Sequence, residues 1–236
     1  MATKLNQNLK LHIFDIGKEG EREYISGIAK NSKHKPIVVT NAGFFSMNFE
    51  KAEHSGALIV DGQELSPYQP RWDDSNSYTD LVKLANTFIQ WKDGRTEIKK
   101  ITVNDLEHIK QNAEWAIGAG YTLVQDGNIM VTKNNEVTGN DWYDRHNKRS
   151  RTMFGINKDG NYISVVVDGD GVEGNMGVTA YEQAQIIKQL GAVNAINFDG
   201  GYSSAFWYDG SVRNNPSRRI GSVMIITSKQ WFNTAK

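Results

Sequence analysis

Residues 162–204 read YISVVVDGDGVEGNMGVTAYEQAQIIKQLGAVNAINFDGGYSS, and this stretch decides the fold. Apolar residues run almost without interruption at 162–167 and at 193–198, which predicts two buried strands. Between the runs, Thr-Ala-Tyr-Glu at 179–182 is a capping box, and an apolar helical face follows it as far as Gly191, a typical stop residue. The segment therefore predicts a βαβ unit.

Each strand of this unit is followed directly by an aspartate. Asp168 comes after the first apolar run and Asp199 after the second. The strands of a βαβ unit are parallel, so we expect both aspartates at the carboxyl ends of neighbouring strands. Open sheets bind their ligands at that edge. Both carboxylates are therefore candidate catalytic groups.

Asp-Gly pairs mark tight turns in the rest of the chain. The pairs that begin at residues 61, 93, 126 and 209 follow short apolar or aromatic runs, and each predicts a β-hairpin. Further buried strands are expected at 37–40 and 222–227, a short helix at about 104–111, and long surface loops at 66–78 and 134–151. The expected fold class is α+β: one domain over residues 1–236, with a mixed β-sheet, several hairpins, few helices and one βαβ unit.

Composition excludes several kinds of function. Lys and Arg number 27, as do Asp and Glu, so the chain lacks the basic excess that nucleic-acid binding requires. It has no cysteine, which excludes disulfides, thiolate nucleophiles and Cys-ligated metals. No stretch approaches the roughly 18 apolar residues of a membrane span, and residues 1–10 lack the apolar core of a signal peptide. We therefore expect no membrane partner, and a cytoplasmic or virion-associated protein.

The stretch after the second buried strand is the most informative for chemistry. Asp199 ends the strand, Gly200 and Gly201 allow a tight turn with positive φ, and the polar residues Tyr202, Ser203 and Ser204 follow. This pattern predicts an anion cradle beside an acid or base. The alternative is a plain Gly-Gly turn capped by the aspartate.

Polar residues also stand at the ends of two other predicted strands. Asn41 and Gly43 follow the strand expected at 37–40, although they would also suit a loop glycine beside core aromatics. Arg151 and Thr152 stand where a polar loop meets the next apolar run. A guanidinium there can clamp a phosphate with two hydrogen bonds, or can simply face solvent.

Metal and cofactor motifs are weak. The loop Asp168-Gly-Asp170-Gly-Val-Glu173 departs from calcium-loop spacing at Val172, and the five histidines show no zinc-type pairing. Nucleotide-binding glycine loops and hydrolase elbows are absent. The sequence thus requires no cofactor, leaves a divalent cation such as calcium open, and assigns no metal ligands. Glu182 is a third candidate carboxylate, although the capping box also accounts for it.

The order of these segments resembles the phosphodiester glycosidase domain family. The resemblance covers about residues 37–227 and rests on NAGFF at 41–45, GALIVDG at 56–62, Arg-Thr at 151–152, VVVDG at 165–169 and NFDGGYSS at 197–204. The chain departs from the family at Tyr202, where a third glycine is usual.

This resemblance implies hydrolysis of a sugar-1-phosphodiester, such as a cell-wall or other glycan phosphodiester, to free sugar and a phosphomonoester. Cleavage would pass through an oxocarbenium-like state, and the leaving group, with a second pKa of about 6, needs little protonation. Arg151 and loop amides around residues 200–204 would hold the phosphate. Asp199 is the first candidate for the acting carboxylate, ahead of Asp168 and Glu182.

Two other functions fit the same residues. One is a carbohydrate or cell-wall binding component of a phage virion that has no turnover. The other is a hydrolase of a nucleotide sugar or nucleotide signal. The sequence specifies neither the sugar, the aglycone, the anomer nor the oligomeric state.

Overall fold

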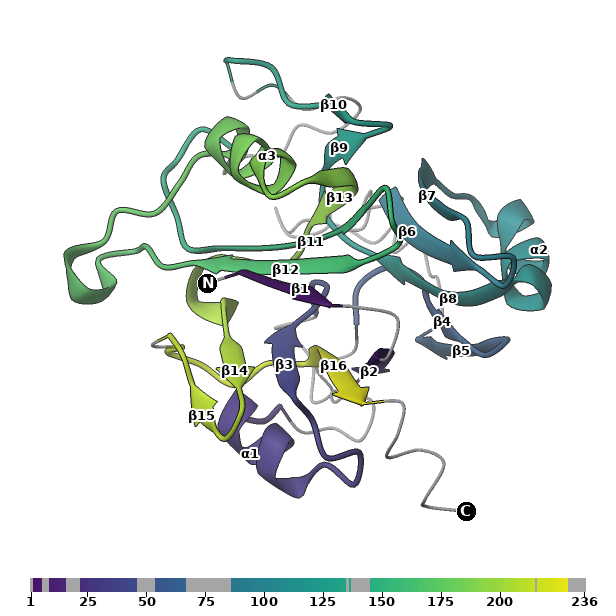
Figure 1. Cartoon of the computed structure of the whole chain (residues 1–236), viewed down its shortest axis with the longest axis horizontal. Helices are drawn as coiled ribbons and strands as arrows, with labels where there is room; N and C mark the ends of the chain where they lie inside the picture. The colour runs from purple at the N-terminus through teal and green to yellow at the C-terminus, as the bar shows by residue number, and fades with distance from the viewer. Residues whose placement is uncertain are drawn as a thin grey trace, which may run out of the picture.

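The fold is built from three antiparallel β-sheets and few helices (Figure 1). The computed structural model describes residues 2–5, 9–15, 22–45, 54–66, 86–134, 136, 145–214 and 216–228. Most of the two expected long loops, at 66–78 and 134–151, falls outside these ranges.

The first sheet, with its helix, carries the stretch that the sequence singled out. Its strands, in spatial order, are β1 (Ala2–Leu5), β12 (Tyr162–Val167), β11 (Arg151–Asn157), β13 (Ala192–Asn197), β9 (Thr122–Gln125) and β10 (Asn128–Ile129). Helix α3 (Ala180–Gln189) packs on β9, β13 and β11. Its capping box is present, because Thr179 accepts from the Glu182 amide and Glu182 accepts from the Thr179 amide. The predicted helix is confirmed.

The predicted pairing of the two flanking strands is wrong. Strand β11 lies between β12 and β13 and is antiparallel to both, so these two strands are parallel without being neighbours. Every strand pairing among the described residues is antiparallel, and the expected mixed sheet is corrected accordingly. The cause is the turn around Gly160, where β11 reverses directly into β12 before α3 begins. Asp168 and Asp199 still follow strands that end at the same edge.

The second sheet combines strands from the first and the last parts of the chain. It consists of β15 (Ser211–Val212), β14 (Phe206–Tyr208), β3 (Val38–Asn41), β16 (Ser222–Ser228) and β2 (Leu9–Asp15). Helix α1 (Ile25–Asn31), which the sequence did not predict, packs on β3 and β14. The strands expected at 37–40 and 222–227 are confirmed as β3 and β16.

The third sheet forms the side of the molecule drawn at the right of Figure 1. Its strands are β5 (Gln63–Ser66), β4 (Leu58–Val60), β8 (Ala113–Gly118), β6 (Asn86–Trp91) and β7 (Thr96–Lys100). A short 3-10 turn, η3 (Val103–Asp105), leads into α2 (Leu106–Asn112) and confirms the helix expected near residues 104–111.

All four predicted hairpins are present. They join β4 to β5, β6 to β7, β9 to β10 and β14 to β15. In the turns at Asp61, Asp126 and Asp209 the aspartate and the following glycine both have positive φ, with the aspartates between 43° and 50°. This is the type I′ geometry that matches strand twist, and Asp-Gly adopts it at low cost.

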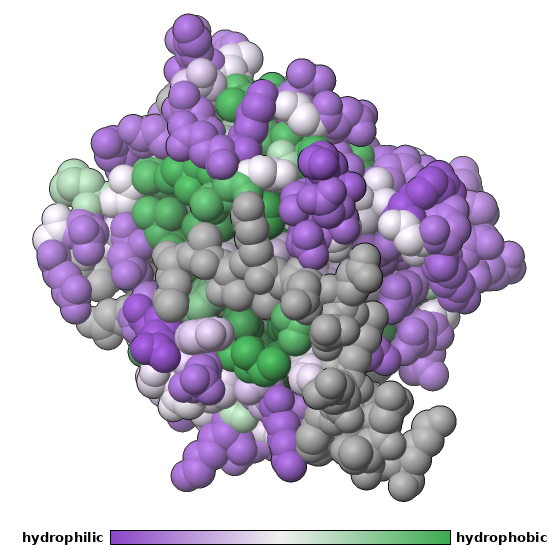
Figure 2. All heavy atoms as spheres, viewed as in Figure 1, coloured by the Kyte–Doolittle hydropathy of each residue, from purple (hydrophilic) through white to green (hydrophobic). Residues whose placement is uncertain are grey.

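One hydrophobic core joins the sheets. Phe154 of the first sheet, Met224 of the second and Leu58 of the third are fully buried in the same cluster. A shared core of this kind is what a single domain requires. Hydrophilic side chains cover most of the rim of the face in Figure 2, with apolar ones nearer its middle. None of the helices in the described part of the chain is long and apolar enough to cross a membrane.

Candidate functional site

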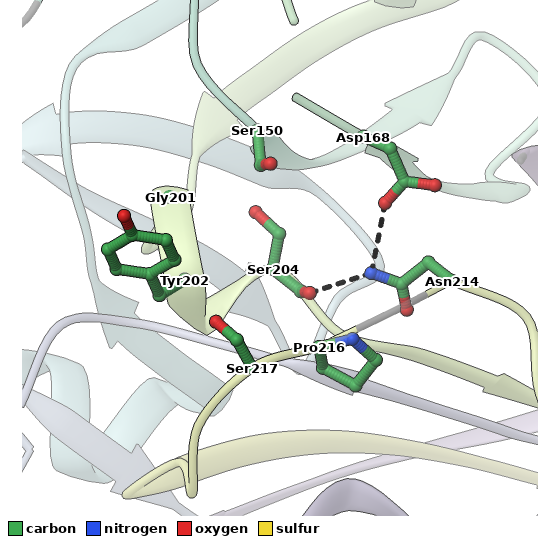
Figure 3. A pocket seen from close by; sticks show the side chains of 8 residues that line it. All are labelled: Ser150, Asp168, Gly201, Tyr202, Ser204, Asn214, Pro216 and Ser217. Carbon is green, nitrogen blue, oxygen red and sulfur yellow. Dashed lines mark hydrogen bonds between the residues drawn. The ribbon is translucent and has the colours of Figure 1, made fainter. Parts of the chain in front are cut away.

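A small hollow lies at the edge where β12 and β13 end (Figure 3). Three strand ends contribute to it, together with the loop between β15 and β16. Its lining consists of Ser150, Asp168, Gly201, Tyr202, Ser204, Asn214, Pro216 and Ser217. The hollow is small, so it suits one group of a ligand rather than a whole ligand.

Asn214 fixes one wall of this hollow. Its side-chain Nδ2 donates to Asp168 Oδ1 at 3.2 Å and to the Ser204 carbonyl at 2.7 Å, and its Oδ1 accepts from the Phe206 amide at 2.7 Å. Figure 3 shows the first two bonds as dashed lines. Because both ends of the amide are used, the carboxylate of Asp168 is held against the turn that contains Ser204.

Ser204 carries an unsatisfied hydroxyl. The residue is 3% exposed, and its Oγ has no hydrogen-bond partner among the described residues. In Figure 3 this hydroxyl points toward Ser150, on the inner side of the hollow. A buried polar atom left without a partner costs about 1–3 kcal/mol, so this hydroxyl calls for an explanation.

Asp199 directly precedes the same turn and is not among the residues that line the hollow. It is 8% exposed, and burial raises the pKa of its carboxyl, an effect that the Arg218 charge and hydrogen bonds from Ser203 and Gly200 oppose. Arg218 Nη2 is 3.5 Å from Asp199 Oδ2. A buried carboxylate therefore has a guanidinium as its neighbour, an arrangement that is common in active sites.

Two contacts orient the guanidinium of Arg218. Its Nε donates to Ser203 Oγ at 2.7 Å, its Nη2 donates to the same oxygen, and its Cζ lies 5.4 Å from the centre of the Phe45 ring. The side chain of Arg218 remains 33% exposed. The group is thus positioned and still reachable by an anion from solvent.

The turn itself offers few free amides. The N–H of Gly201 donates to the Ser150 carbonyl, and those of Ser203 and Ser204 donate to the carbonyls of Gly200 and Gly201. These bonds close the 3-10 turn η5 (Gly201–Ser203), in which Gly201 has a φ of 57°. These hydrogen bonds occupy three of the amides from which the expected cradle would be built, and a role of residues 200–204 in binding phosphate stays a prediction.

Asn41 and Thr152 hold the turn at its two ends. Asn41 Nδ2 donates to the Asp199 carbonyl at 2.6 Å, and its Oδ1 accepts from Thr152 Oγ1 at 2.8 Å and from the Ala205 amide at 3.0 Å. Both side chains are buried. They place the residues between 199 and 205, and direct contact with a substrate stays a prediction for both.

Gly43 allows two chain segments to approach closely. A Cβ at this position would lie 2.7 Å from the Gly118 carbonyl and closer still to the His54 ring. Any larger residue would push the end of β3 away from β8. The glycine is thus explained by packing, and a role for Gly43 in binding substrate stays a prediction.

Arg151 faces the protein backbone. It is 3% exposed, its Nε donates to the Val178 carbonyl at 3.3 Å, and its Nη2 donates to the Asn147 carbonyl at 3.0 Å. The guanidinium ties the segment before β11 to the segment before α3, and Arg151 is not among the residues that line the hollow. Of the two arginines, Arg218 is the one beside the candidate carboxylate Asp199.

Glu182 belongs to the start of α3. One carboxylate oxygen accepts from the Thr179 amide, which lowers the pKa of Glu182, and the other lies 3.5 Å from Lys148 Nζ. The side chain is 40% exposed and does not line the hollow. The structure does not bring Glu182 together with Asp168 in that lining.

Glu182 provides a first test. Glu182→Ala should lower the free energy of unfolding by about 1 kcal/mol through loss of the cap, and Glu182→Gln should restore most of it. Both variants should keep the kcat of the wild type. Urea unfolding and turnover of an accepted phosphodiester measure the two effects. A large loss of kcat in the Gln variant, with normal unfolding, would return Glu182 to the site.

In the candidate cation loop, the carboxylate of Asp170 is bonded to other groups of the protein. The side chain of Asp170 is 5% exposed and accepts from the Ser150 amide at 2.8 Å and from Arg149 Nη1 at 2.9 Å. Within the described ranges, no three His, Cys, Asp or Glu side chains gather as a metal site would need. Asp170 therefore orders the wall of the hollow at Ser150.

Sequence reasoning missed Ser150, Asn214, Ser217 and Arg218. A usable signal existed for Arg218, because Arg218-Arg219 precedes the buried run at 222–227 much as Arg149-Ser150 precedes β11, which begins at Arg151. For the other three, only their position in space distinguishes them from ordinary loop residues.

Comparison with known proteins finds similar sequences over most of the chain. A family model described as phosphodiester glycosidase matches residues 34–227. The SPbeta prophage-derived uncharacterized protein YomE of Bacillus subtilis (strain 168) is 27% identical over 209 residues, covering 87% of this chain and 29% of that protein. The N-acetylglucosamine-1-phosphodiester alpha-N-acetylglucosaminidase of Mus musculus is 27% identical over 183 residues, covering 76% of this chain and 33% of that enzyme. The chain spans about a third of the length of these relatives.

Solved structures share the fold. The catalytic domain of the zebrafish N-acetylglucosamine-1-phosphodiester alpha-N-acetylglucosaminidase superposes with a TM-score of 0.69 at 20% identity, covering 97% of this chain and 88% of that one. A hypothetical protein from Synechocystis gives a TM-score of 0.62 at 17% identity, covering 95% and 58%.

Proposed function

Because this chain belongs to the phosphodiester glycosidase family, we propose that it hydrolyses a sugar-1-phosphodiester to the free sugar and a phosphomonoester. The observation that carries the proposal is the pair of the buried Asp199 and its neighbour Arg218. Asp199, whose pKa is raised by burial, would act as the acid-base group, and Arg218 would be the cation that binds the phosphate. Cell-wall and other glycan phosphodiesters are the substrates we favour.

In the proposed reaction, water attacks the anomeric carbon and its oxygen stays with the sugar. The bond from that carbon to the phosphate oxygen breaks, and the electron pair leaves with the phosphomonoester. The carboxylate of Asp199 accepts the proton of the attacking water, or stabilises the positive charge that develops on the sugar ring. Arg218 binds the phosphate, whose negative charge grows as the bond breaks.

The test combines a substrate screen with isotope labelling. Sugar-1-phosphodiesters, wall polymers and nucleotide sugars are incubated with the protein in H2(18)O, and the products are analysed by mass spectrometry. We expect free sugar carrying the label and an unlabelled phosphomonoester. Label in the phosphate would show cleavage at phosphorus and contradict the proposal. Release of a nucleoside diphosphate would identify a nucleotide sugar as the substrate.

A second candidate function is glycan binding without turnover in a phage particle. The prophage origin of one relative favours it. The same screen separates the two functions, since saturable binding of a wall polymer with no released product supports the binding role and contradicts the hydrolase.

A further inference from the structure

We propose that the hollow beside Asp168 binds the hydroxyl groups of the sugar ring, and that the phosphate binds beside Arg218, which is not among the residues that line the hollow. This inference rests on the proposed function. It divides the site into a neutral, hydroxyl-binding half and an anion-binding half.

The charge of the lining favours a neutral ligand. Asp168 is the one ionisable carboxylate among the eight lining residues, and none of the eight is Lys, Arg or His. A phosphate placed there would face a carboxylate of the same sign with no cation in the wall, and such a pair repels at short range. Sugar hydroxyls donate hydrogen bonds to a carboxylate without that penalty, and a bond to a charged acceptor is stronger than a neutral one.

The carboxylate of Asp168 is positioned for this role. Among the described residues, Asn214 alone donates to it, and it does so to Oδ1. Since the amide of Asn214 is also bound at Ser204 and Phe206, the orientation of Asp168 is set before any ligand arrives. Oδ2 has no donor among the described residues, which leaves it as an acceptor for a sugar hydroxyl.

Ser204 supplies the second, independent observation. Its Oγ is buried, lies in the lining of the hollow and has no partner among the described residues. A hydroxyl both donates and accepts, as the hydroxyls of a sugar do. A bound sugar would therefore give a hydrogen-bond partner to an atom that has none among the described residues, a gain that helps to offset the cost of ordering the ligand.

Tyr202 stands at the rim of the hollow and is 60% exposed. An exposed aromatic ring offers an apolar face beside a polar floor. A sugar ring has the same two-sided character, with C–H groups on its faces and hydroxyls around its edge. The rim and the floor thus match one ligand class.

The experiment measures binding of two kinds of probe to the intact chain. Neutral monosaccharides (glucose, galactose, mannose and N-acetylglucosamine) and inorganic phosphate are titrated separately, followed by ligand-observed NMR. We expect at least one sugar to bind the wild type. Asp168→Asn should weaken that sugar about 10-fold or more, because a bond to a charged acceptor is replaced by a neutral one, and should leave phosphate binding unchanged or tighter.

Ser204→Ala should weaken the same sugar about 2- to 10-fold, the range of one hydrogen bond. Its matched control is Ser164→Ala, which removes another buried, unpartnered hydroxyl within β12, away from the lining. Asp209→Asn is the control for charge, since Asp209 is exposed in the turn between β14 and β15. Neither control should change sugar binding.

Several results would overturn the inference: no saturable sugar binding to the wild type, equal sugar affinity in Asp168→Asn, or a loss of phosphate binding in that variant. The proposed function fails separately. If sugar binding depends on Asp168 and Ser204 but the protein shows no turnover, this inference is supported and the proposed hydrolase function is contradicted. If the protein turns over a phosphodiester but substitutions of Asp168 and Ser204 leave sugar binding unchanged, the hydrolase function is supported and this inference is contradicted. Thermal unfolding of each variant shows that the fold is retained.

Discussion

Asp199→Asn should lower kcat on an accepted phosphodiester by about 10²- to 10⁴-fold, the usual contribution of one acid-base group. Asparagine keeps the size of the side chain and most of its hydrogen bonds, but removes the charge that activates water or stabilises an oxocarbenium ion. The fold should survive, because the Asp199 backbone is held by Asn41 and by the Ala42 carbonyl, which a side-chain change leaves in place.

The measurement is kcat together with the melting temperature of both proteins. Retained activity would show that Asp199 caps the Gly-Gly turn, where asparagine is an equally good residue, and would move the assignment to Asp168. Parallel losses of activity and melting temperature would point to a structural role. Asp209→Asn, in an exposed hairpin turn, is the matched control and should behave as wild type.

The same variant should also change how stability depends on pH. Burial raises the pKa of Asp199, so the folded protein holds this proton more tightly than the unfolded chain does. Its contribution to stability is complete below the unfolded pKa of about 3.9 and is lost as pH rises through the folded pKa. In urea unfolding, the free energy of unfolding of Asp199→Asn should therefore increase relative to that of the wild type as the pH rises through the folded pKa of Asp199. A relative loss would mean that the Arg218 pairing outweighs burial.

Arg218→Gln should lower kcat/KM by about 10²-fold, the loss seen when one donor to a developing negative charge is removed. It should also weaken inhibition by inorganic phosphate. Arg218→Lys keeps the charge but loses the planar fork that Ser203 and Phe45 orient, so it should recover part of the activity.

Arg219→Gln is the control for this variant. Arg219 is the next residue along the chain, and its guanidinium lies over the Tyr24 ring at 5.5 Å, so the substitution removes the same charge from a different environment. Its kinetics should match wild type. Equal losses in the two variants would mean that general charge, rather than the position of Arg218, attracts the substrate.

Much of the fold could be predicted because its signals are local. The capping box of α3 depends on a threonine and a glutamate three residues apart, and Asp-Gly is one of the pairs that favour a tight hairpin turn. Helix α3 and the hairpins therefore follow from a few neighbouring residues. The position of β11 between β12 and β13 could not be predicted from such local signals. A buried apolar run shows that a strand is covered on both faces, but not which strand lies beside it.

The sequence by itself determined the hairpins, the capped helix, the carboxylates at two strand ends and the resemblance to a family, because each depends on residues that are close in the chain. Only the tertiary structure decided which arginine lies beside Asp199. Arg151 begins a buried strand and Arg218 precedes one. The carbonyls of Asn147 and Val178 accept hydrogen bonds from Arg151, while Ser203 and Phe45 hold Arg218. The direction of a long side chain is set by the partners that packing brings to it, and these partners come from distant segments.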